Sequence, residues 1–196
     1  MPSSTQLPLF LASTSPRRRE LLAQLGLRFD VISADVDETH LPDESPEAYV
    51  RRLAIAKAEA GAVQAGSSAL VIGADTTVTR NGHVLAKPGS REEAFAMWTL
   101  LSGGEHEVLT GVAVAGEGRV EATVVSTRVC FREITPAEME AYWASGEPAD
   151  KAGAYAIQGR GAVFVSGISG SYSNVVGLPL SETAALLACF GYSVWK

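Results

Sequence analysis

The run of residues 69–78 restricts the possible folds of this chain more than any other segment. Its residues are almost all apolar or small, and Asp75 is the only charged one. A near-continuous apolar run is typical of a strand covered on both faces, whereas a strand with one face in water alternates. Asn81-Gly82 then predicts a hairpin turn, and residues 83–87 are expected to return as an antiparallel strand that Pro88 closes.

Helices are expected on both sides of this strand along the chain. Four helix starts combine a capping residue with a following proline or with glutamate three positions later: Ser15-Pro16, Ser45-Pro46, Ser90 with Glu93, and Thr135 with Glu138. The predicted helices cover residues 16–25, 46–65, 91–101, 136–144 and 181–190. Further strands are expected at 9–12, 29–32, 107–115, 120–131 and 162–165. Helices that alternate with hairpin and crossover strands predict an α/β fold, with a mixed twisted sheet flanked by helices.

Length and composition predict a single globular domain. The chain has 196 residues, of which 46% are hydrophobic and 19% charged, so we expect one domain over residues 1–196, with two lobes around a cleft as a variant. Seven glycines fall within residues 146–180. They indicate either a backbone that approaches a ligand closely or simply tight turns.

Charge and targeting signals exclude several classes of protein. The net charge of −6 disfavours nucleic-acid binding through a broad basic face, although a local basic pocket for a small polyanion is compatible with it. No signal peptide and no apolar run of membrane-spanning length is expected. Cys130 and Cys189 have no zinc-ligand spacing, and we interpret both as buried thiols. These features predict a cytoplasmic protein that does not bind a membrane.

The segment from Leu9 to Arg19 has the composition of an anion site. An apolar strand runs into a helix whose first turn brings together three hydroxyl side chains and three arginines. Free N–H groups at a helix N-terminus, serine hydroxyls and guanidinium groups all suit phosphate. The alternative is an ordinary capped surface helix with solvated arginines.

Two acidic residues are candidates for catalysis or metal binding. Asp75 lies within a buried strand, where a carboxylate must be paired, metal-bound or catalytic to offset its desolvation. Its neighbours on the same face, Gly73 and Thr77, are small and predict a hollow beside it. The alternative is a strand-end aspartate bonded to a backbone turn. Glu38, in the acidic turn 35–40, can supply a second oxygen ligand for Mg²⁺, or can be a solvated surface residue.

Two lysines are candidates for the same site. Lys57 lies on the face of its predicted helix that also carries Val50, Leu53 and Ala54, so it either extends to the rim or points into a cleft. Lys87 falls opposite Thr76 in a regular hairpin, on the face away from Asp75, and only a bulge or bend ahead of Pro88 would bring it to the carboxylate.

Other catalytic classes find no support. The three histidines, His40, His83 and His106, lie singly and are interpreted as non-catalytic. Ser13 and Ser15 are not in a nucleophile elbow, and neither a Walker P-loop nor a dinucleotide-binding glycine motif occurs.

Five separated motifs resemble the Maf family of nucleoside triphosphate pyrophosphatases, in the family's order. They are residues 12–18 (ASTSPRR), 73–76 (GADT), 86–88 (AKP), 150–159 (DKAGAYAIQG) and 170–179 (GSYSNVVGLP). The resemblance spans about residues 9–190. It implies an α/β fold of the inosine-triphosphatase-like type with a central cleft, a divalent cation (Mg²⁺ or Mn²⁺), and hydrolysis of a nucleoside triphosphate to the monophosphate and pyrophosphate.

The resemblance also implies roles for individual residues. Asp75 matches the proton acceptor, and with Glu38 we expect it to hold the metal. Arg17, Thr76 and Gln158 match positions associated with base selection. The remaining pocket positions are Ser13, Arg18, Lys57 and Lys87. The segment Tyr155-Ala156-Ile157-Gln158-Gly159 is similar to the branch that cleaves dTTP and UTP.

The sequence leaves alternatives open. The same machinery can cleave a purine or modified-base triphosphate such as 7-methyl-GTP, or the chain can bind nucleotide without hydrolysis as a regulator of septum formation. The expected partner is the nucleoside triphosphate itself, and a homodimer is an open alternative to a monomer.

Overall fold

The computed structural model describes residues 7–195. Within this range, seven strands form one mixed sheet in the order β2-β1-β3-β5-β6-β7, with β4 paired to β3. The strands are β1 (Leu9–Leu11), β2 (Asp30–Val31), β3 (Leu70–Arg80), β4 (His83–Leu85), β5 (Glu105–Gly116), β6 (Arg119–Phe131) and β7 (Val165–Ser169). β1 is parallel to both β2 and β3, whereas β4 runs antiparallel to β3 and β7 antiparallel to β6. The predicted mixed sheet is confirmed.

The helices within residues 7–195 are α1 (Pro16–Gln24), α2 (Pro46–Ala65), α3 (Arg91–Leu101), α4 (Pro136–Ala144), α5 (Tyr172–Val176) and α6 (Leu180–Cys189), with the short 3-10 helices η1 (Glu147–Asp150), η2 (Ala152–Ala154) and η3 (Arg160–Phe164). The helices α1 to α4 start where the capping residues predicted. α6 starts one residue before its predicted range, and α5 was not predicted. The hydroxyls of Ser45, Ser90 and Thr135 accept hydrogen bonds from backbone N–H groups in the first turns of their helices. None of the helices within residues 7–195 has the length and apolar character needed to cross a membrane.

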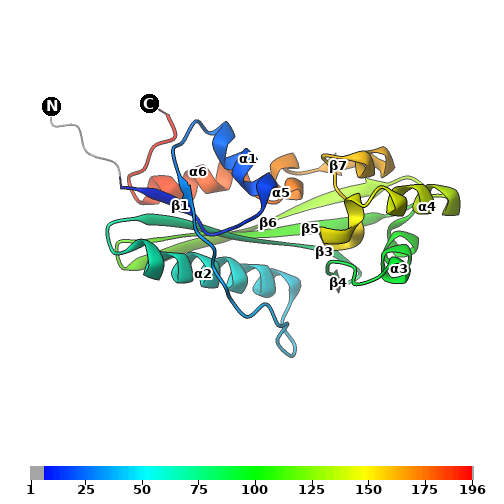
Figure 1. The fold of residues 1–196 in the computed structure, drawn as a ribbon, viewed down its shortest axis with the longest axis horizontal. Helices are drawn as coiled ribbons and strands as arrows, with labels where there is room; N and C mark the ends of the chain where they lie inside the picture. Colours follow the sequence, from blue (N-terminus) through cyan, green and yellow to red (C-terminus); the bar gives the residue numbers. More distant parts are fainter. Residues whose placement is uncertain (1–6, 196) are drawn as a thin grey trace. The chain divides into compact units, whose positions relative to one another are not determined.

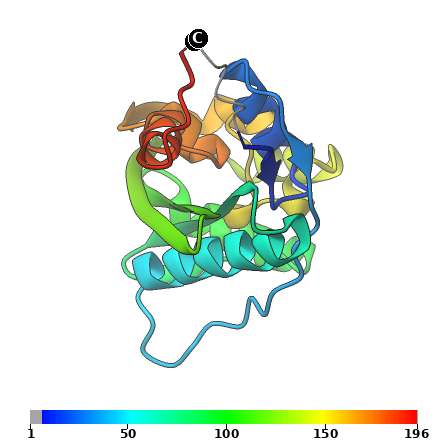
Figure 2. The same ribbon diagram turned by 90° about the vertical axis from the view of Figure 1, so that its left-hand side faces the viewer.

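The chain divides into two compact units. Unit 1 combines the described residues of Met1–Asp75, Thr110–Val124 and Gly177–Lys196, and unit 2 combines Thr76–Leu109 and Val125–Val176. In unit 1, α2 covers one face of the sheet, and α1 and α6 lie on the other (Figures 1 and 2).

The core of unit 1 depends on a close approach of α2 to the sheet. The buried face of this helix includes Val50, Leu53, Ala54 and Lys57, which confirms the predicted stripe. A Cβ atom added to Gly73 of β3 would lie 2.3 Å from the Ala54 carbonyl oxygen and 2.5 Å from the Ala58 nitrogen. Only glycine therefore allows the helix backbone to lie this near the strand. The predicted hollow on this side of Asp75 was wrong at Gly73, because the backbone of α2 occupies that space.

Unit 2 has an aromatic core. Trp98 is fully buried and packs against Phe95 and Tyr142, and its indole N–H donates to the Ala154 carbonyl at 2.8 Å. His106 is also buried, with its Nε2 2.9 Å from the Tyr155 hydroxyl oxygen.

Two predictions from the sequence were wrong in detail. Residues 162–165 were expected to be a strand, but η3 covers most of them and β7 begins at Val165. A four-residue apolar run has too few periods to separate a strand from a helical turn. The thiols were expected to be buried, but Cys130 is only partly buried and Cys189 is exposed.

Candidate functional site

The loop between β1 and α1 is arranged around the Ser13 hydroxyl. Ser15 has the extended backbone of an N-cap residue, but its side chain makes no capping hydrogen bond. Instead, the Ser15 backbone N–H and the Arg18 guanidinium both donate to the Ser13 Oγ, each at 3.3 Å. The expectation of a side-chain cap from Ser15 was therefore wrong, because the turn closes on Ser13.

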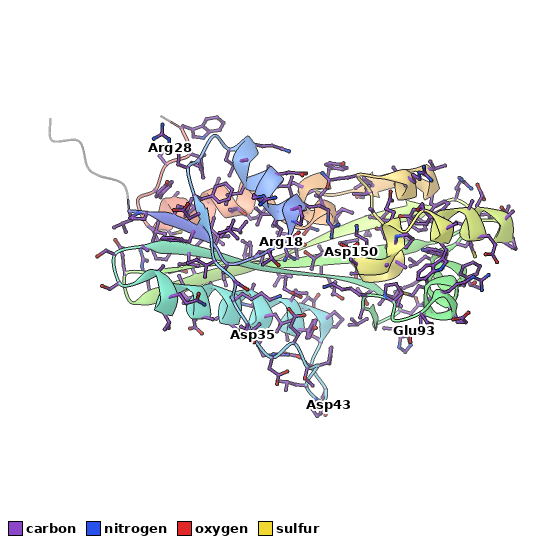
Figure 3. All side chains as sticks on the ribbon, in the orientation of Figure 1. Arg18, Arg28, Asp35, Asp43, Glu93 and Asp150 are labelled. Atoms are coloured by element: carbon purple, nitrogen blue, oxygen red, sulfur yellow. The ribbon has the colours of Figure 1, made fainter. Side chains whose placement is uncertain are left out.

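Arg18 extends from the first turn of α1 (Figure 3), and its Nε donates to the Gly177 carbonyl oxygen at 2.8 Å. Desolvation lowers the pKa of Arg18, while the charges of Asp75 and Glu38 oppose that shift. Arg17 is partly buried, and its charge adds to the lowering. The guanidinium of Arg18 thus lies in the electrostatic field of the two candidate carboxylates.

Lys57 joins the two candidate carboxylates directly. Its Nζ lies 2.7 Å from Asp75 Oδ1 and 2.7 Å from Glu38 Oε1. The side chains of Lys57 and Asp75 are only 11% and 13% exposed, whereas that of Glu38 is 55% exposed. The cluster therefore has a buried carboxylate, a buried ammonium between the two acids, and a second carboxylate that reaches solvent. A buried aspartate in this setting is compensated by charge pairing.

This geometry selects among the alternatives that the sequence left open. Asp75 lies in the middle of β3 and is paired with a lysine, so the alternative of a strand-end aspartate held by a turn is wrong. Lys57 does not extend to the rim of its helix but points inward to the acids.

The carboxylates are a plausible set of ligands for a divalent cation. Mg²⁺ is usually held by one or two carboxylates, with phosphate oxygens and water completing its shell. Glu38 and Asp75 both lie within 2.7 Å of the Lys57 ammonium, so the two carboxylates are close to one another. Among the residues that the structure describes, no group of three or more His, Cys, Asp or Glu side chains forms a metal cage.

Sequence reasoning missed two residues that lie beside this cluster. Tyr49 and Arg52 of α2 both donate hydrogen bonds to backbone carbonyls of the loop that carries Glu38. Neither belongs to the apolar stripe of α2, and their partners lie on a segment without periodicity, so no pattern in the sequence marked them.

The other three predicted residues belong to unit 2. Thr76 follows Asp75 in β3 and is partly buried, and Gln158 is exposed in the turn between η2 and η3. Lys87 is exposed and follows β4, whose ladder with β3 ends at the pair Val78 and Leu85. The regular hairpin register therefore does not extend to Lys87. The roles of these three residues stay predictions.

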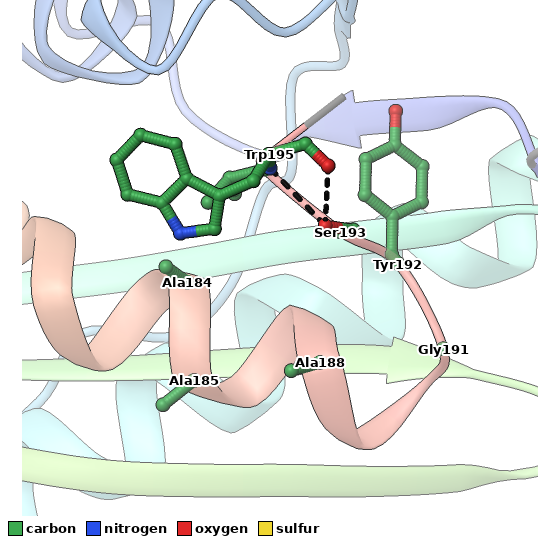
Figure 4. Close-up of a pocket in the computed structure, with 8 residues that line it drawn as sticks. Ala184, Ala185, Ala188, Gly191, Tyr192, Ser193 and Trp195 are labelled. Atoms are coloured by element: carbon green, nitrogen blue, oxygen red, sulfur yellow. Dashed lines mark hydrogen bonds between the residues drawn. The ribbon is translucent and has the colours of Figure 1, made fainter.

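A hollow beside α6 in unit 1 does not suit a nucleotide. It has a volume of about 430 Å³ and lies between α6 and the C-terminal segment, where the Ser193 hydroxyl exchanges hydrogen bonds with the backbone of Trp195 (Figure 4). Its lining is alanine, glycine, serine, valine and aromatic residues, with no charged side chain among them. Such a surface offers nothing to compensate the charge of a triphosphate.

Comparison with known proteins gives a consistent result. Residues 8–190 match the family model described as Maf, Maf-like protein. The chain is 57% identical over 195 residues to a protein of Myxococcus xanthus named dTTP/UTP pyrophosphatase, covering 99% of this chain and 98% of that protein. A protein of Moorella thermoacetica with the same name is 55% identical over 193 residues, covering 95% of this chain and 97% of that protein.

A search of solved structures finds the Staphylococcus aureus Ham1 protein, with a TM-score of 0.46 and 19% identity, covering 65% of this chain and 72% of that chain. The match to the family model spans nearly the whole sequence, and the two relatives align over 99% and 95% of this chain. This chain belongs to the Maf family.

Proposed function

We propose that this protein hydrolyses dTTP and UTP to the nucleoside monophosphate and pyrophosphate. The observation that carries the proposal is the convergence of the buried Asp75 and the half-exposed Glu38 on Lys57. The names of the relatives, which share more than half of their residues with this chain, support dTTP and UTP as the substrates.

Asp75 is the proposed proton acceptor. Its Oδ1 is bonded to Lys57, so we assign the other oxygen to the attacking water. Asp75 orients this water and takes its proton as the water oxygen bonds to the α-phosphorus in line with the leaving group. The bond from the α-phosphorus to the bridging oxygen breaks, and pyrophosphate leaves with the electron pair.

Cationic side chains are proposed to bind the polyphosphate and to stabilise its developing charge. Arg17 and Arg18 come from the first turn of α1 and Lys57 from α2, and Lys87 is a further candidate. Guanidinium groups match phosphate oxygens in pairs, and such preorganised charges act most strongly where water is excluded. The Ser13 Oγ already accepts from Arg18 and Ser15, so its hydroxyl hydrogen is directed to substrate in this proposal.

Glu38 and Asp75 are the proposed ligands of Mg²⁺ or Mn²⁺. When bound, such a cation supplies Lewis-acid neutralisation of phosphate charge. Lys57 is then the residue that keeps the two carboxylates together before the cation and substrate arrive.

Base selection is assigned to Arg17, Thr76 and Gln158. The amide of Gln158 offers both a donor and an acceptor, which can pair with the O4 and N3–H edge of uracil or thymine. A single Maf-like domain, a cytoplasmic location and a homodimer remain predictions of the same proposal.

The decisive experiment is pyrophosphate release from a panel of nucleoside triphosphates, with Mg²⁺ and with EDTA. We expect turnover of UTP and dTTP that EDTA abolishes. Faster turnover of a purine triphosphate or of 7-methyl-GTP would change the substrate assignment. Stoichiometric triphosphate binding without product would instead indicate a nucleotide sensor and contradict the proposed activity.

A further inference from the structure

Glu38 lies on a loop that has no helix or strand to hold it. The loop covers residues 32–45, between β2 and α2, and Figure 3 labels Asp35 and Asp43 within it. Glu38 is exposed, yet its carboxylate must stay 2.7 Å from the Lys57 ammonium to complete the cluster. Such a segment needs contacts from outside itself to define one conformation.

Tyr49 supplies the first of these contacts. Its hydroxyl donates to the backbone carbonyl of Glu38 at 3.0 Å, so the hydrogen bond fixes the residue that carries the carboxylate. The Tyr49 ring also stacks on His40, with 4.8 Å between ring centroids and 21° between planes. Tyr49 therefore contacts the loop at Glu38 and again two residues later.

Arg52 supplies the second contact. Its Nε and one terminal nitrogen bond both oxygens of Glu44, at 2.6 and 2.8 Å, and that terminal nitrogen also donates to the Thr39 carbonyl at 3.0 Å. The hydrogen bonds from Arg52 hold the pKa of Glu44 at about 2. A bidentate pair of this kind is geometrically specific. The loop is thus held on both sides of its tip.

Both contacts come from the helix that also carries Lys57. α2 therefore determines the position of the ammonium and, through Tyr49 and Arg52, the position of the carboxylate that pairs with it. Burial and the charges of Asp75 and Glu38 raise the pKa of Tyr49, which is consistent with a phenol beside both acids.

We propose that Tyr49 and Arg52 are positioning residues that hold Glu38 against Lys57, in the place where Glu38 and Asp75 can share a divalent cation. The part about the cation rests on the proposed function. The part about Glu38 and Lys57 does not, and the two are tested separately.

The first test measures the Lys57 amine in the protein without metal or nucleotide. An amine-acylating reagent is applied for short times, and labelling of Lys57 is quantified by mass spectrometry against Lys151 in the same sample. Glu38→Gln should raise Lys57 labelling because the ammonium loses one partner. Tyr49→Phe keeps the ring stacked on His40 but loses the hydroxyl, and should raise labelling about two- to tenfold, the range expected for one lost hydrogen bond.

The double variant Tyr49→Phe/Glu38→Gln makes the test specific. If Tyr49 acts through Glu38, the double variant labels like Glu38→Gln alone. Arg52→Met should behave like Tyr49→Phe, and Arg52→Lys should restore part of the effect. Tyr192→Phe and Arg51→Met remove a tyrosine hydroxyl and a guanidinium group elsewhere in unit 1, and they should leave the labelling of Lys57 unchanged. Wild-type labelling in Tyr49→Phe, additive effects in the double variant, or no effect of Glu38→Gln would each overturn the proposal.

The second test measures pyrophosphate release from UTP as a function of Mg²⁺. Tyr49→Phe should raise the half-saturating Mg²⁺ concentration about two- to tenfold, with the KM for UTP at saturating Mg²⁺ unchanged. A half-saturating Mg²⁺ concentration that is the same in Tyr49→Phe and in the wild type would overturn the proposal that Tyr49 positions Glu38 for the cation. If the wild type releases no pyrophosphate from any nucleotide, the proposed function fails, and the labelling experiment still decides whether Tyr49 and Arg52 hold Glu38.

Discussion

Asp75 is a buried carboxylate paired with the Lys57 ammonium, and the role of its charge can be tested by one substitution. Asp75→Asn keeps the shape of the side chain but can neither accept the proton of water nor balance the Lys57 ammonium. We expect kcat to fall by about 10²- to 10⁴-fold, the usual contribution of general-base catalysis. UTP binding, measured by calorimetry, should remain largely intact because the arginines of α1 are unchanged.

Asp30→Asn is the matched control. Asp30 is exposed in β2, in the same unit as Asp75, and its change should leave both kcat and UTP binding as in the wild type. Normal turnover in Asp75→Asn would remove Asp75 from the mechanism.

The sequence identified Asp75 and Lys57 for a clear reason. Each is a charged residue in a place where its local pattern calls for an apolar or small one. The salt bridge between them could not be predicted, because it depends on the position of α2 along β3. This position is determined by the contact of Gly73 with the backbone at Ala54 and Ala58, and no local sequence pattern indicates it.

The packing of α2 on β3 can be tested at that contact. Gly73→Ala would place a Cβ 2.3 Å from a backbone oxygen of α2, so the helix has to move. Overpacking of this kind costs about 1–3 kcal/mol, and we expect urea unfolding to show a loss of that size. Because Lys57 lies on the same helix, turnover should fall as well.

Gly167→Ala provides the comparison. Gly167 lies in β7, and the nearest atom to an added Cβ there is 4.0 Å away, the Cβ of Cys130. Its free energy of unfolding should stay near the wild-type value. Equal losses in the two variants would mean that the contact between Gly73 and α2 is not tight in solution.

Helix starts could be predicted from the sequence, but one turn could not. Capping residues act over three or four positions, so Ser45, Ser90 and Thr135 carry their own signal. The 3-10 turn at the start of η3 is instead closed by Glu147, which accepts from the N–H groups of Arg160 and Gly161. Its partner lies more than ten residues away, so residues 162–165 gave a misleading local pattern.

Across the whole molecule, the order of elements follows from the sequence, but their grouping does not. Unit 1 gathers residues from the beginning, middle and end of the chain. Hydrophobic periodicity and helix caps describe each segment separately. Neither signal indicates which distant strands and helices pack against one another. The family motifs were informative in a different way, because they identify the family from the residue identities of five separated segments.

The stability of the whole molecule should fall as the pH decreases from 6.5 to 4, and one buried histidine, His106, should cause most of this loss. Burial lowers the pKa of His106 to about 4, and the charge of Arg80 adds to this. Within the described part of the chain, its Nδ1 has no hydrogen-bond partner, so a second ring proton would be buried without compensation. The unfolded chain takes up this proton near pH 6.5, and the folded chain only near pH 4.

Protonation therefore favours the unfolded state throughout this window, and stability should fall as the pH decreases. The difference between the two pKa values corresponds to at most about 3 kcal/mol, with no further loss from His106 below pH 4. Urea unfolding at pH 7, 5.5 and 4 measures this loss in the free energy of unfolding.

His106→Gln retains an amide that can reach the Tyr155 hydroxyl but does not titrate, so its stability should decline less over the same pH range. His83→Gln, at an exposed position, should follow the wild type. Parallel pH dependence in His106→Gln and the wild type would show that other groups cause the acid sensitivity. Glu44 and Glu138 are such groups: their pKa values are lowered from 4.5 to about 2, so the stability that they contribute is lost as the pH falls through that range.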